Sequence, residues 1–271
     1  MRMSLRNPRR SVLLTALLLA CSAPVMAQSA ATTTESAPAA EEVSPQVVSP
    51  EAQVVLDRMT AYLKGLQNFS IDSDATRDEV VSYGYKLQHN EHSTLTVQRP
   101  GKMRAEVAGD IRDRTFVYDG SKLVIYSPDD QVYTSTPATG SLKDLIGGLL
   151  DAGVELPLID VLYQASNGSL TEAVRGGILV GDATIDGVPC DHLAFRQSNA
   201  DWQLWVEKGD RPVPRKVVIT TRFEVGDPQY SAVMSWNLQP KIDATTFTFT
   251  PPKGVELIPF ADAAAVQARS P

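Results

Sequence analysis

The sequence predicts an α+β fold in which helices cover one face of a long antiparallel β-sheet. Three observations predict it: alternation with a period of two dominates from about residue 69 onward, an amphipathic helix precedes the strands, and a helical insert interrupts them. Most strands follow one another through short turns, so neighbouring strands should pair antiparallel. This order of elements is typical of a single α+β domain.

The first 27 residues have the pattern of a secretory signal peptide. An apolar stretch from Val12 to Ala20 follows an arginine-rich start, and small residues precede a cleavage point after Ala27. An alternative is lipidation at Cys21, because Leu18-Leu19-Ala20-Cys21 loosely fits the motif at which a cysteine becomes a lipidated N-terminus. Both alternatives lead to export, and we expect a periplasmic protein.

The charge and the cysteine content argue against a nucleic-acid-binding protein and against a fold stabilised by an intramolecular disulfide. Removing residues 1–27 takes away four arginines and no acidic residue, so the formal net charge changes from -7 to -11. A chain this acidic is a poor partner for nucleic acid. Cys190 is the only cysteine left after cleavage at Ala27, so we expect no intramolecular disulfide.

The two ends of the mature chain are expected to be disordered. Residues 28–48 almost lack large apolar side chains and should form a tether, and residues 261–271 should form a disordered tail. Between them, residues 49–260 should form a single domain. Its first helix should begin at Ser49, which can cap it, with Pro50 in the first position. The buried face of this helix, which ends near Gly65, should carry Val55, Met59, Tyr62, Leu63 and Leu66.

Strands are expected wherever apolar and polar residues alternate. Asp119-Gly120 and Asp186-Gly187 are typical of hairpin turns between such runs. The expected strands are residues 69–73, 94–98, 102–107, 115–118, 122–126, 131–134, 178–185, 190–196, 202–207, 216–223, 229–238 and 246–250.

A helical insert is expected in the middle of the chain. Ser141 and Asp144 have the spacing of a capping box, and Gly147 and Gly148 interrupt the helix that follows. These glycines either let the insert bend or allow close packing on the sheet. Pro157 should start a second helix. The apolar positions are Leu142, Leu145, Ile146, Leu149 and Leu150 in the first helix, and Leu158, Ile159, Val161, Leu162 and Tyr163 in the second.

Motifs of catalysis and metal binding are weak in this chain. His89 and His92 are three apart in an alternating segment, so they should point to opposite faces of a strand and cannot bind one ion together. Asp72 and Asp74 share a face, which we interpret as solvated. We therefore expect no metal site, no cofactor and no catalytic residue.

The stretch from Cys190 to His192 is the one place where a nucleophile is conceivable. Both side chains should share a strand face, and a Cys/His pair can form an activated thiol. However, the sequence identifies no orienting partner or oxyanion hole, and Asp191 disfavours a thiolate. A buried cysteine and a hydrogen-bonded histidine are the favoured interpretation.

Two tryptophans lie three residues apart in the segment DWQLWVE. Trp202 and Trp205 must face opposite sides of a strand, so only one of them should lie inside. We expect the inner tryptophan to have a hydrogen-bond partner for its indole N–H.

Four segments carry a resemblance to a known family. They are Asp186–Phe195 (DGVPCDHLAF), Asp201–Glu207 (DWQLWVE), Pro212–Lys216 (PVPRK) and Phe247–Gly254 (FTFTPPKG). Together they resemble a family of predicted periplasmic proteins, domain of unknown function 2092, which is grouped with the outer-membrane lipoprotein carriers (LolA/LolB-like). The resemblance implies an unclosed antiparallel β-barrel, a half-barrel whose concave apolar face is covered by helices and forms a pocket for acyl chains.

This resemblance, together with the helical insert, leads to a functional expectation. We expect a non-catalytic periplasmic protein that binds or carries a lipid, an acyl chain or another hydrophobic ligand. The residues expected at the ligand are Met59, Tyr62, Leu145, Ile146, Leu149, Leu150, Ile159, Leu162 and Trp202.

Two other functions stay open at this point. One is an envelope scaffold or interaction protein whose barrel is filled by its own side chains. The other is a hydrolase that depends on Cys190 and His192. The expected partners are a hydrophobic small molecule or lipid, with an envelope protein and transient membrane contact as further candidates. We expect a monomer.

Overall fold

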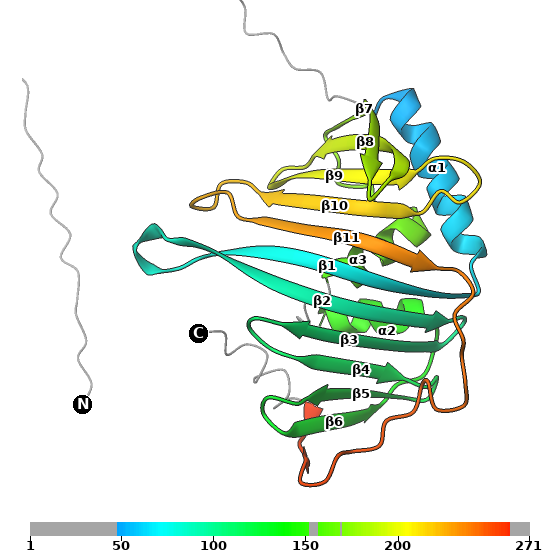
Figure 1. Ribbon diagram of the computed structural model, residues 1–271, viewed down its shortest axis with the longest axis vertical. Helices are drawn as coiled ribbons and strands as arrows, with labels where there is room; N and C mark the ends of the chain where they lie inside the picture. Colours follow the sequence, from blue (N-terminus) through cyan, green and yellow to red (C-terminus); the bar gives the residue numbers. More distant parts are fainter. Residues whose placement is uncertain (1–47, 152–156, 169, 261–271) are drawn as a thin grey trace, which may run out of the picture. The chain divides into compact units, whose positions relative to one another are not determined.

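The computed structural model describes residues 48–151, 157–168 and 170–260 (Figure 1). The predicted signal peptide, nearly all of the predicted tether and the predicted tail lie outside these residues. No helix in the described ranges is long and apolar enough to cross a membrane.

The described chain is built on one sheet in the order β12-β6-β5-β4-β3-β2-β1-β11-β10-β9-β8-β7. All neighbours pair antiparallel except β12 and β6, which are parallel. The two edge strands, β12 and β7, are not paired with each other, so the barrel is unclosed as predicted. The strands are β1 (Asn68–Val80), β2 (Lys86–Gln98), β3 (Lys102–Gly109), β4 (Arg114–Tyr118), β5 (Lys122–Ser127), β6 (Val132–Pro137), β7 (Gly176–Ile185), β8 (Val188–Arg196), β9 (Ala200–Glu207), β10 (Pro214–Thr221), β11 (Gln229–Asn237) and β12 (Glu256–Leu257).

The first helix, α1 (Pro50–Gly65), has the predicted bounds and cap. Ser49 is the N-cap, and its side chain accepts a hydrogen bond from the amide of Ala52 at 3.3 Å. Tyr62 and Leu66, which were predicted to be buried, are only half-buried and pack against the margin of the core. The buried side chains are Ala52, Val55, Leu56, Met59 and Leu63.

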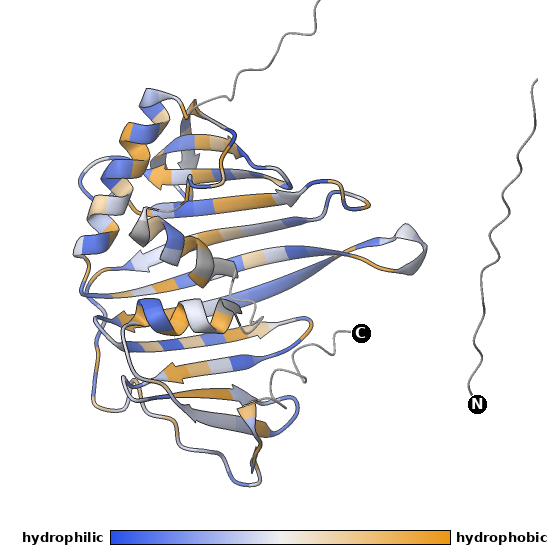
Figure 2. Cartoon of the chain, turned by 180° about the vertical axis from the view of Figure 1, so that it is seen from behind, coloured by the Kyte–Doolittle hydropathy of each residue, from blue (hydrophilic) through white to orange (hydrophobic). Residues whose placement is uncertain are grey.

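The helical insert forms α2 (Leu142–Asp151) and α3 (Pro157–Asn167), both on the same side of the sheet (Figure 2). The predicted capping box is present in both directions. The amide of Asp144 donates to the Ser141 hydroxyl at 3.3 Å, and the amide of Ser141 donates to the Asp144 carboxylate at 2.9 Å. Local sequence therefore determines where α2 begins.

The strand predictions differ from the structure at three places in the C-terminal part of the chain. Residues 246–250 form a turn followed by residues without regular secondary structure, because the Asp243 carboxylate accepts hydrogen bonds from the amides of Thr245 and Thr246 at 2.8 and 2.9 Å. These local bonds compete with strand pairing. The short strand β12 was not predicted. In addition, β10 ends at Thr221, and Phe223 lies in the following turn with a φ of 69°.

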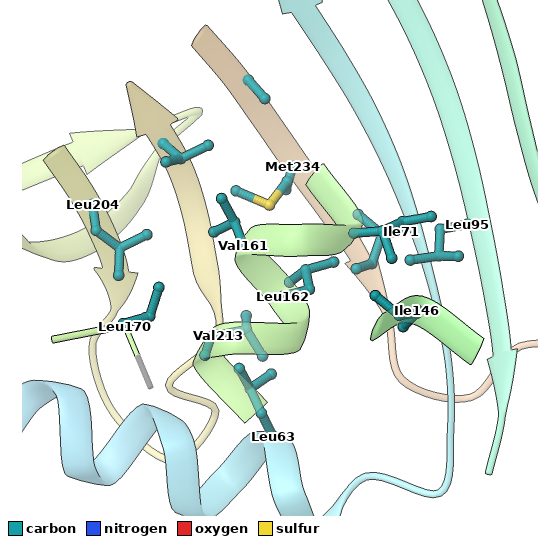
Figure 3. Packing of buried hydrophobic residues seen from close by; sticks show 14 of the residues in the cluster. Leu63, Ile71, Leu95, Ile146, Val161, Leu162, Leu170, Leu204, Val213 and Met234 are labelled. Atoms are coloured by element: carbon teal, nitrogen blue, oxygen red, sulfur yellow. The ribbon is translucent and has the colours of Figure 1, made fainter. Parts of the chain in front are cut away.

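One apolar cluster joins the helices to the sheet. Figure 3 shows Leu162 of α3 and Ile146 of α2 beside Ile71 and Leu95 of the central strands. All four side chains are buried. Burial of a Leu or Ile side chain contributes about 1.5–3 kcal/mol, so the insert is held mainly by this contact.

Candidate ligand-binding face

The face of the sheet that the three helices cover is called the inner face below. Register pairing places its side chains in rows that run from strand to strand. The central row from β11 to β5 contains only aliphatic and aromatic residues, and its indole N–H, that of Trp236, donates to the Pro214 carbonyl at 2.7 Å. This region is therefore suited to a hydrocarbon chain. The row consists of Trp236, Ile71, Leu95, Ala105, Phe116 and Ile125.

The structure brings most of the predicted ligand residues into one apolar cluster. Six are buried in it: Met59, Ile146, Leu149, Ile159, Leu162 and Trp202. Tyr62 and Leu145 are half-buried at its margin. Leu150 belongs to α2, but its side chain lies outside the described ones. The predicted residues are therefore candidates for a shared site, and ordinary helix-to-sheet packing uses the same positions.

The two tryptophans separate as predicted. Trp202 is 7% exposed on the inner face and stacks on Phe195 with ring centroids 4.0 Å apart. Trp205 lies on the opposite face, where it stacks on His192 at 4.2 Å. One expectation was wrong: the buried indole N–H of Trp202 has no hydrogen-bond partner among the described residues. Packing against Phe195 holds this ring in place without a polar anchor.

The two glycines of α2 have free space around them. A Cβ added at Gly147 or Gly148 would have no neighbour within 4 Å among the described residues. Close packing on the sheet therefore does not explain either glycine. Each costs the helix about 1 kcal/mol relative to alanine, and no described residue gives this cost a packing reason.

The histidines of β2 bind separate carboxylates. His89 Nε2 lies 3.0 Å from Glu79 Oε2, and His92 Nδ1 lies 2.8 Å from Asp74 Oδ1. The two rings point to opposite faces of the strand, as alternation predicted. Within the described ranges, no group of three His, Cys, Asp or Glu side chains could hold a metal ion.

Cys190 and His192 share the outer face of β8, but they are held by different neighbours. The Cys190 thiol is fully buried and donates to the Val188 carbonyl at 3.4 Å. His192 instead bonds Gln203 at 2.9 Å. Burial raises the pKa of the Cys190 thiol, an effect that nearby Arg215 opposes only in part. A raised pKa disfavours the thiolate that a nucleophile requires.

We expect Cys190 to be unreactive in the folded protein. Its modification by 5,5′-dithiobis(2-nitrobenzoic acid) should be roughly 1,000-fold slower than in the urea-unfolded chain, because the thiol is reached only through local opening. As a control, a Cys190→Ala/Thr184→Cys variant places the thiol at an exposed position of the neighbouring strand. Fast labelling of native wild-type protein, equal to that of the control, would contradict the buried, inert thiol.

The chain is similar to a family of predicted periplasmic proteins and to several solved structures. The model of the predicted periplasmic protein family DUF2092 matches residues 52–261. No curated protein matches the sequence. The chain is similar to three solved structures. LprF from Mycobacterium bovis has 15% identity and a TM-score of 0.45, covering 72% of this chain and 97% of that one. Lipoprotein LppX from Mycobacterium tuberculosis has 15% identity and a TM-score of 0.43, covering 72% and 100%. A LolA superfamily protein from Nitrosomonas europaea has 13% identity and a TM-score of 0.33, covering 73% and 97%.

Proposed function

The chain belongs to the predicted periplasmic protein family DUF2092, which confirms the family predicted from the sequence, and on that premise we propose that it carries a lipid or another hydrophobic ligand. The ligand would lie between the inner face and the helices α2 and α3. We propose no catalytic role, because the buried thiol of Cys190 and the hydrogen-bonded ring of His192 lack the geometry of an activated pair.

The observation that carries this proposal is the pair of glycines in α2. A helix that only sealed a filled barrel would gain stability from alanine at both positions, since nothing described is packed against them. A helix that must bend to admit a bulky ligand gains from glycine instead. This difference favours a carrier over the scaffold with a filled barrel.

A substitution on the buried face of α2 tests the proposal. Protein purified from the periplasm without detergent should carry a lipid that native mass spectrometry detects, and Leu149→Glu should abolish it. Leu149 is 3% exposed in the apolar cluster, so a carboxylate there opposes an acyl chain. Lys143→Glu, at an exposed position of the same helix, should keep the lipid. A wild-type protein that carries no lipid and takes up no added fatty acid or phospholipid would favour the scaffold.

Replacing both glycines of α2 by alanine should stabilise the folded protein and at the same time slow ligand exchange. Gly147→Ala/Gly148→Ala should raise the free energy of unfolding by up to about 2 kcal/mol, because each alanine favours the helix. The same change should slow uptake of N-phenyl-1-naphthylamine about 10- to 30-fold, since the bent helix becomes rarer. Stopped-flow fluorescence would measure the rate, with Lys143→Ala as the control on α2. Faster or unchanged uptake would argue against a bending helix.

Two adjoining hairpin tips provide a surface for transient membrane contact. The β1–β2 tip contains the 3-10 turn Ser82–Gly84. This tip and the β10–β11 tip project from the same end of the strands (Figure 1). Lys86 Nζ donates to the Gly226 carbonyl at 3.3 Å, which joins the two tips. The exposed side chains on this surface, called the hairpin rim below, are Tyr83 (99%), Phe223 (80%), Val225 (75%), Tyr85 (69%) and Leu87 (43%).

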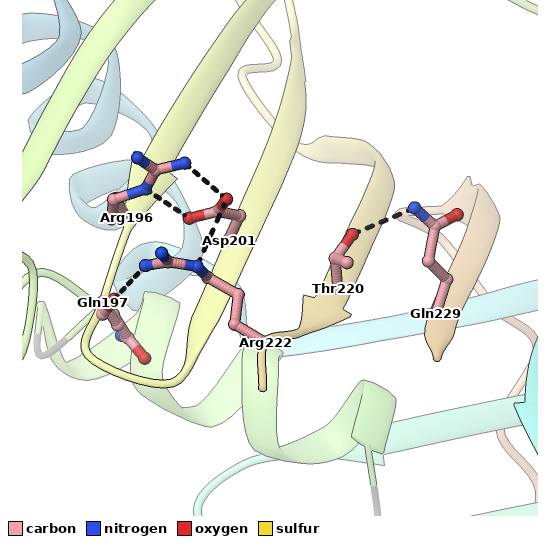
Figure 4. A network of polar contacts seen from close by, with 6 residues as sticks. All are labelled: Arg196, Gln197, Asp201, Thr220, Arg222 and Gln229. Carbon is pink, nitrogen blue, oxygen red and sulfur yellow. Dashed lines mark hydrogen bonds and ion pairs between the residues drawn. The ribbon is translucent and has the colours of Figure 1, made fainter. Parts of the chain in front are cut away.

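The base of the β10–β11 hairpin is fixed by a polar network (Figure 4). Arg222 lies 3.9 Å from the carboxylate of Asp201, which also forms a bidentate pair with Arg196 at 2.8 and 2.7 Å. Arg222 also lies over the ring of Phe223, 4.7 Å from its centroid. The rim is thus presented from an ordered base, and we propose that it touches a bilayer when the ligand is exchanged.

A further inference from the structure

Polar side chains cross the inner face beyond its apolar rows. Along β1 and β2 the inward positions change from Ile71 and Leu95 to hydroxyl and charged groups toward the hairpin. A face that only packed against helices would stay apolar. This group, called the polar band below, consists of Ser73, Arg77, His89, Glu91, Trp202 and Tyr230.

Register pairing places four members of the polar band in one row. Trp202 pairs with Ile219, which pairs with Tyr230. Tyr230 pairs with Arg77, which pairs with His89. Glu91 and Ser73 lie on the same face one and two rows nearer the apolar end, at successive inward positions about 7 Å apart. The band thus adjoins the face that would hold a hydrocarbon chain.

Two members of the band are buried donors that the described protein does not satisfy. Ser73 is 1% exposed, and its hydroxyl has no hydrogen-bond partner among the described residues. The indole N–H of Trp202, 7% exposed, is in the same state. A buried, unmade hydrogen bond costs about 1–3 kcal/mol, so such groups need a reason. A bound molecule with an acceptor oxygen beside Ser73 supplies one for that hydroxyl, whereas Trp202 lies three strands away on β9.

The charges of the band point to the kind of head group. Arg77 lies close enough to Glu91 to favour its ionised form, although burial raises the pKa of that carboxyl overall. Glu79 Oε2 lies 3.0 Å from His89 Nε2, within hydrogen-bond distance. Burial also raises the pKa of the Tyr230 phenol, which keeps it a donor at neutral pH. A carboxylate lies near each of the two basic side chains, Arg77 and His89, so the band offers hydrogen-bond donors and acceptors without a net positive charge. Such a site suits an uncharged polar group better than an anion.

We propose that the polar band binds the head group of an uncharged, hydroxyl-bearing lipid, whose acyl chain lies along the apolar rows of the inner face. The inference rests on the proposed carrier function and adds the ligand class to it. Ser73 and Tyr230 donate to oxygens of the head group, while the carboxyl of Glu91 accepts from a hydroxyl.

Removing two hydroxyl groups tests this assignment. The probes are 1-monooleoylglycerol, oleic acid and the apolar dye N-phenyl-1-naphthylamine, each measured by fluorescence competition or titration on the full chain. Ser73→Ala/Tyr230→Phe should lower the affinity for 1-monooleoylglycerol about tenfold and leave the dye affinity unchanged. Ser235→Ala, an exposed hydroxyl on the outer face of β11, is the matched control and should change neither. Wild-type protein should prefer 1-monooleoylglycerol to oleic acid.

Stability distinguishes a ligand contact from a structural one. Ser73→Ala alone should be as stable as wild type or more stable, because it removes an unsatisfied buried group. Equal affinity of wild type and double variant for 1-monooleoylglycerol would overturn the head-group assignment and leave the carrier function standing. Tighter binding of oleic acid than of 1-monooleoylglycerol would also overturn it. Failure of wild type to bind any of the three probes would overturn the carrier function itself.

Discussion

Gly177→Val is expected to destabilise the protein by at least about 3 kcal/mol, because strain in a packed core costs 1–3 kcal/mol even for small additions. A Cβ at Gly177 would lie 2.5 and 2.7 Å from two ring atoms of Phe195, its cross-strand partner. Phe195 has little room to move away, since its ring stacks on Trp202 of the next strand with centroids 4.0 Å apart. Urea unfolding followed by tryptophan fluorescence would measure the loss.

A second substitution identifies the cause of this loss. Phe195→Leu makes room at the ring position, so Gly177→Ala should cost less in the Phe195→Leu background than in wild type. Gly65→Ala, at a position with no neighbour within 4 Å among the described residues, should cost nothing measurable. If Gly177→Val lies within 1 kcal/mol of wild type, the close glycine–aromatic pair does not constrain the β7 edge.

The edge strand β7 is also hydrogen-bonded at Gly177 to the residues that precede α1. The amide of Ser49 donates to the Gly177 carbonyl at 2.8 Å, and Val48 forms a parallel bridge to the same residue. The N-cap of α1 is therefore attached directly to β7. A bulky residue at Gly177 should disturb both the core stack and the beginning of α1, which explains why we expect a large effect from one glycine.

Elements with strong local signals could be predicted from the sequence. The cap at Ser49 and the reciprocal pair Ser141 and Asp144 defined the helix starts, because their bonds join residues three apart. The wrong strand at residues 246–250 shows the limit of this approach. Its Thr-Phe alternation resembles a strand, but Asp243 captures the backbone amides that pairing would need. Alternation alone does not reveal this competition.

The apolar half of the candidate site could be predicted, whereas of the polar band only Trp202 was predicted. The helical stripes of α1, α2 and α3 identified side chains that join one cluster. Residues 76–93 carry polar groups at both inward and outward positions, so the alternation around His89 and His92 was too weak to define strand bounds, and β1 and β2 were predicted too short. The inward direction of Arg77 and Glu91 follows only from pairing with β11 and β3, which are distant in sequence.

Replacing two aromatic residues of the hairpin rim should abolish most membrane contact. Tyr83→Ser/Phe223→Ser should lower partitioning onto neutral phosphatidylcholine vesicles about 100-fold or more, since each buried aromatic contributes about 1.5–3 kcal/mol. Salt should have little effect, because Lys86 and Arg222 are accompanied by acidic neighbours. Vesicle flotation would measure the change, with Ile178→Ser/Val180→Ser as the control, two exposed apolar positions (55% and 51%) on the distant strand β7. Equal loss of vesicle binding in the control and test variants would mean that scattered apolar surface residues drive the association. Loss of binding in the test variant alone would assign membrane contact to the hairpin rim. The rim lies at the hairpin end of the sheet, where the polar band of the inner face also ends.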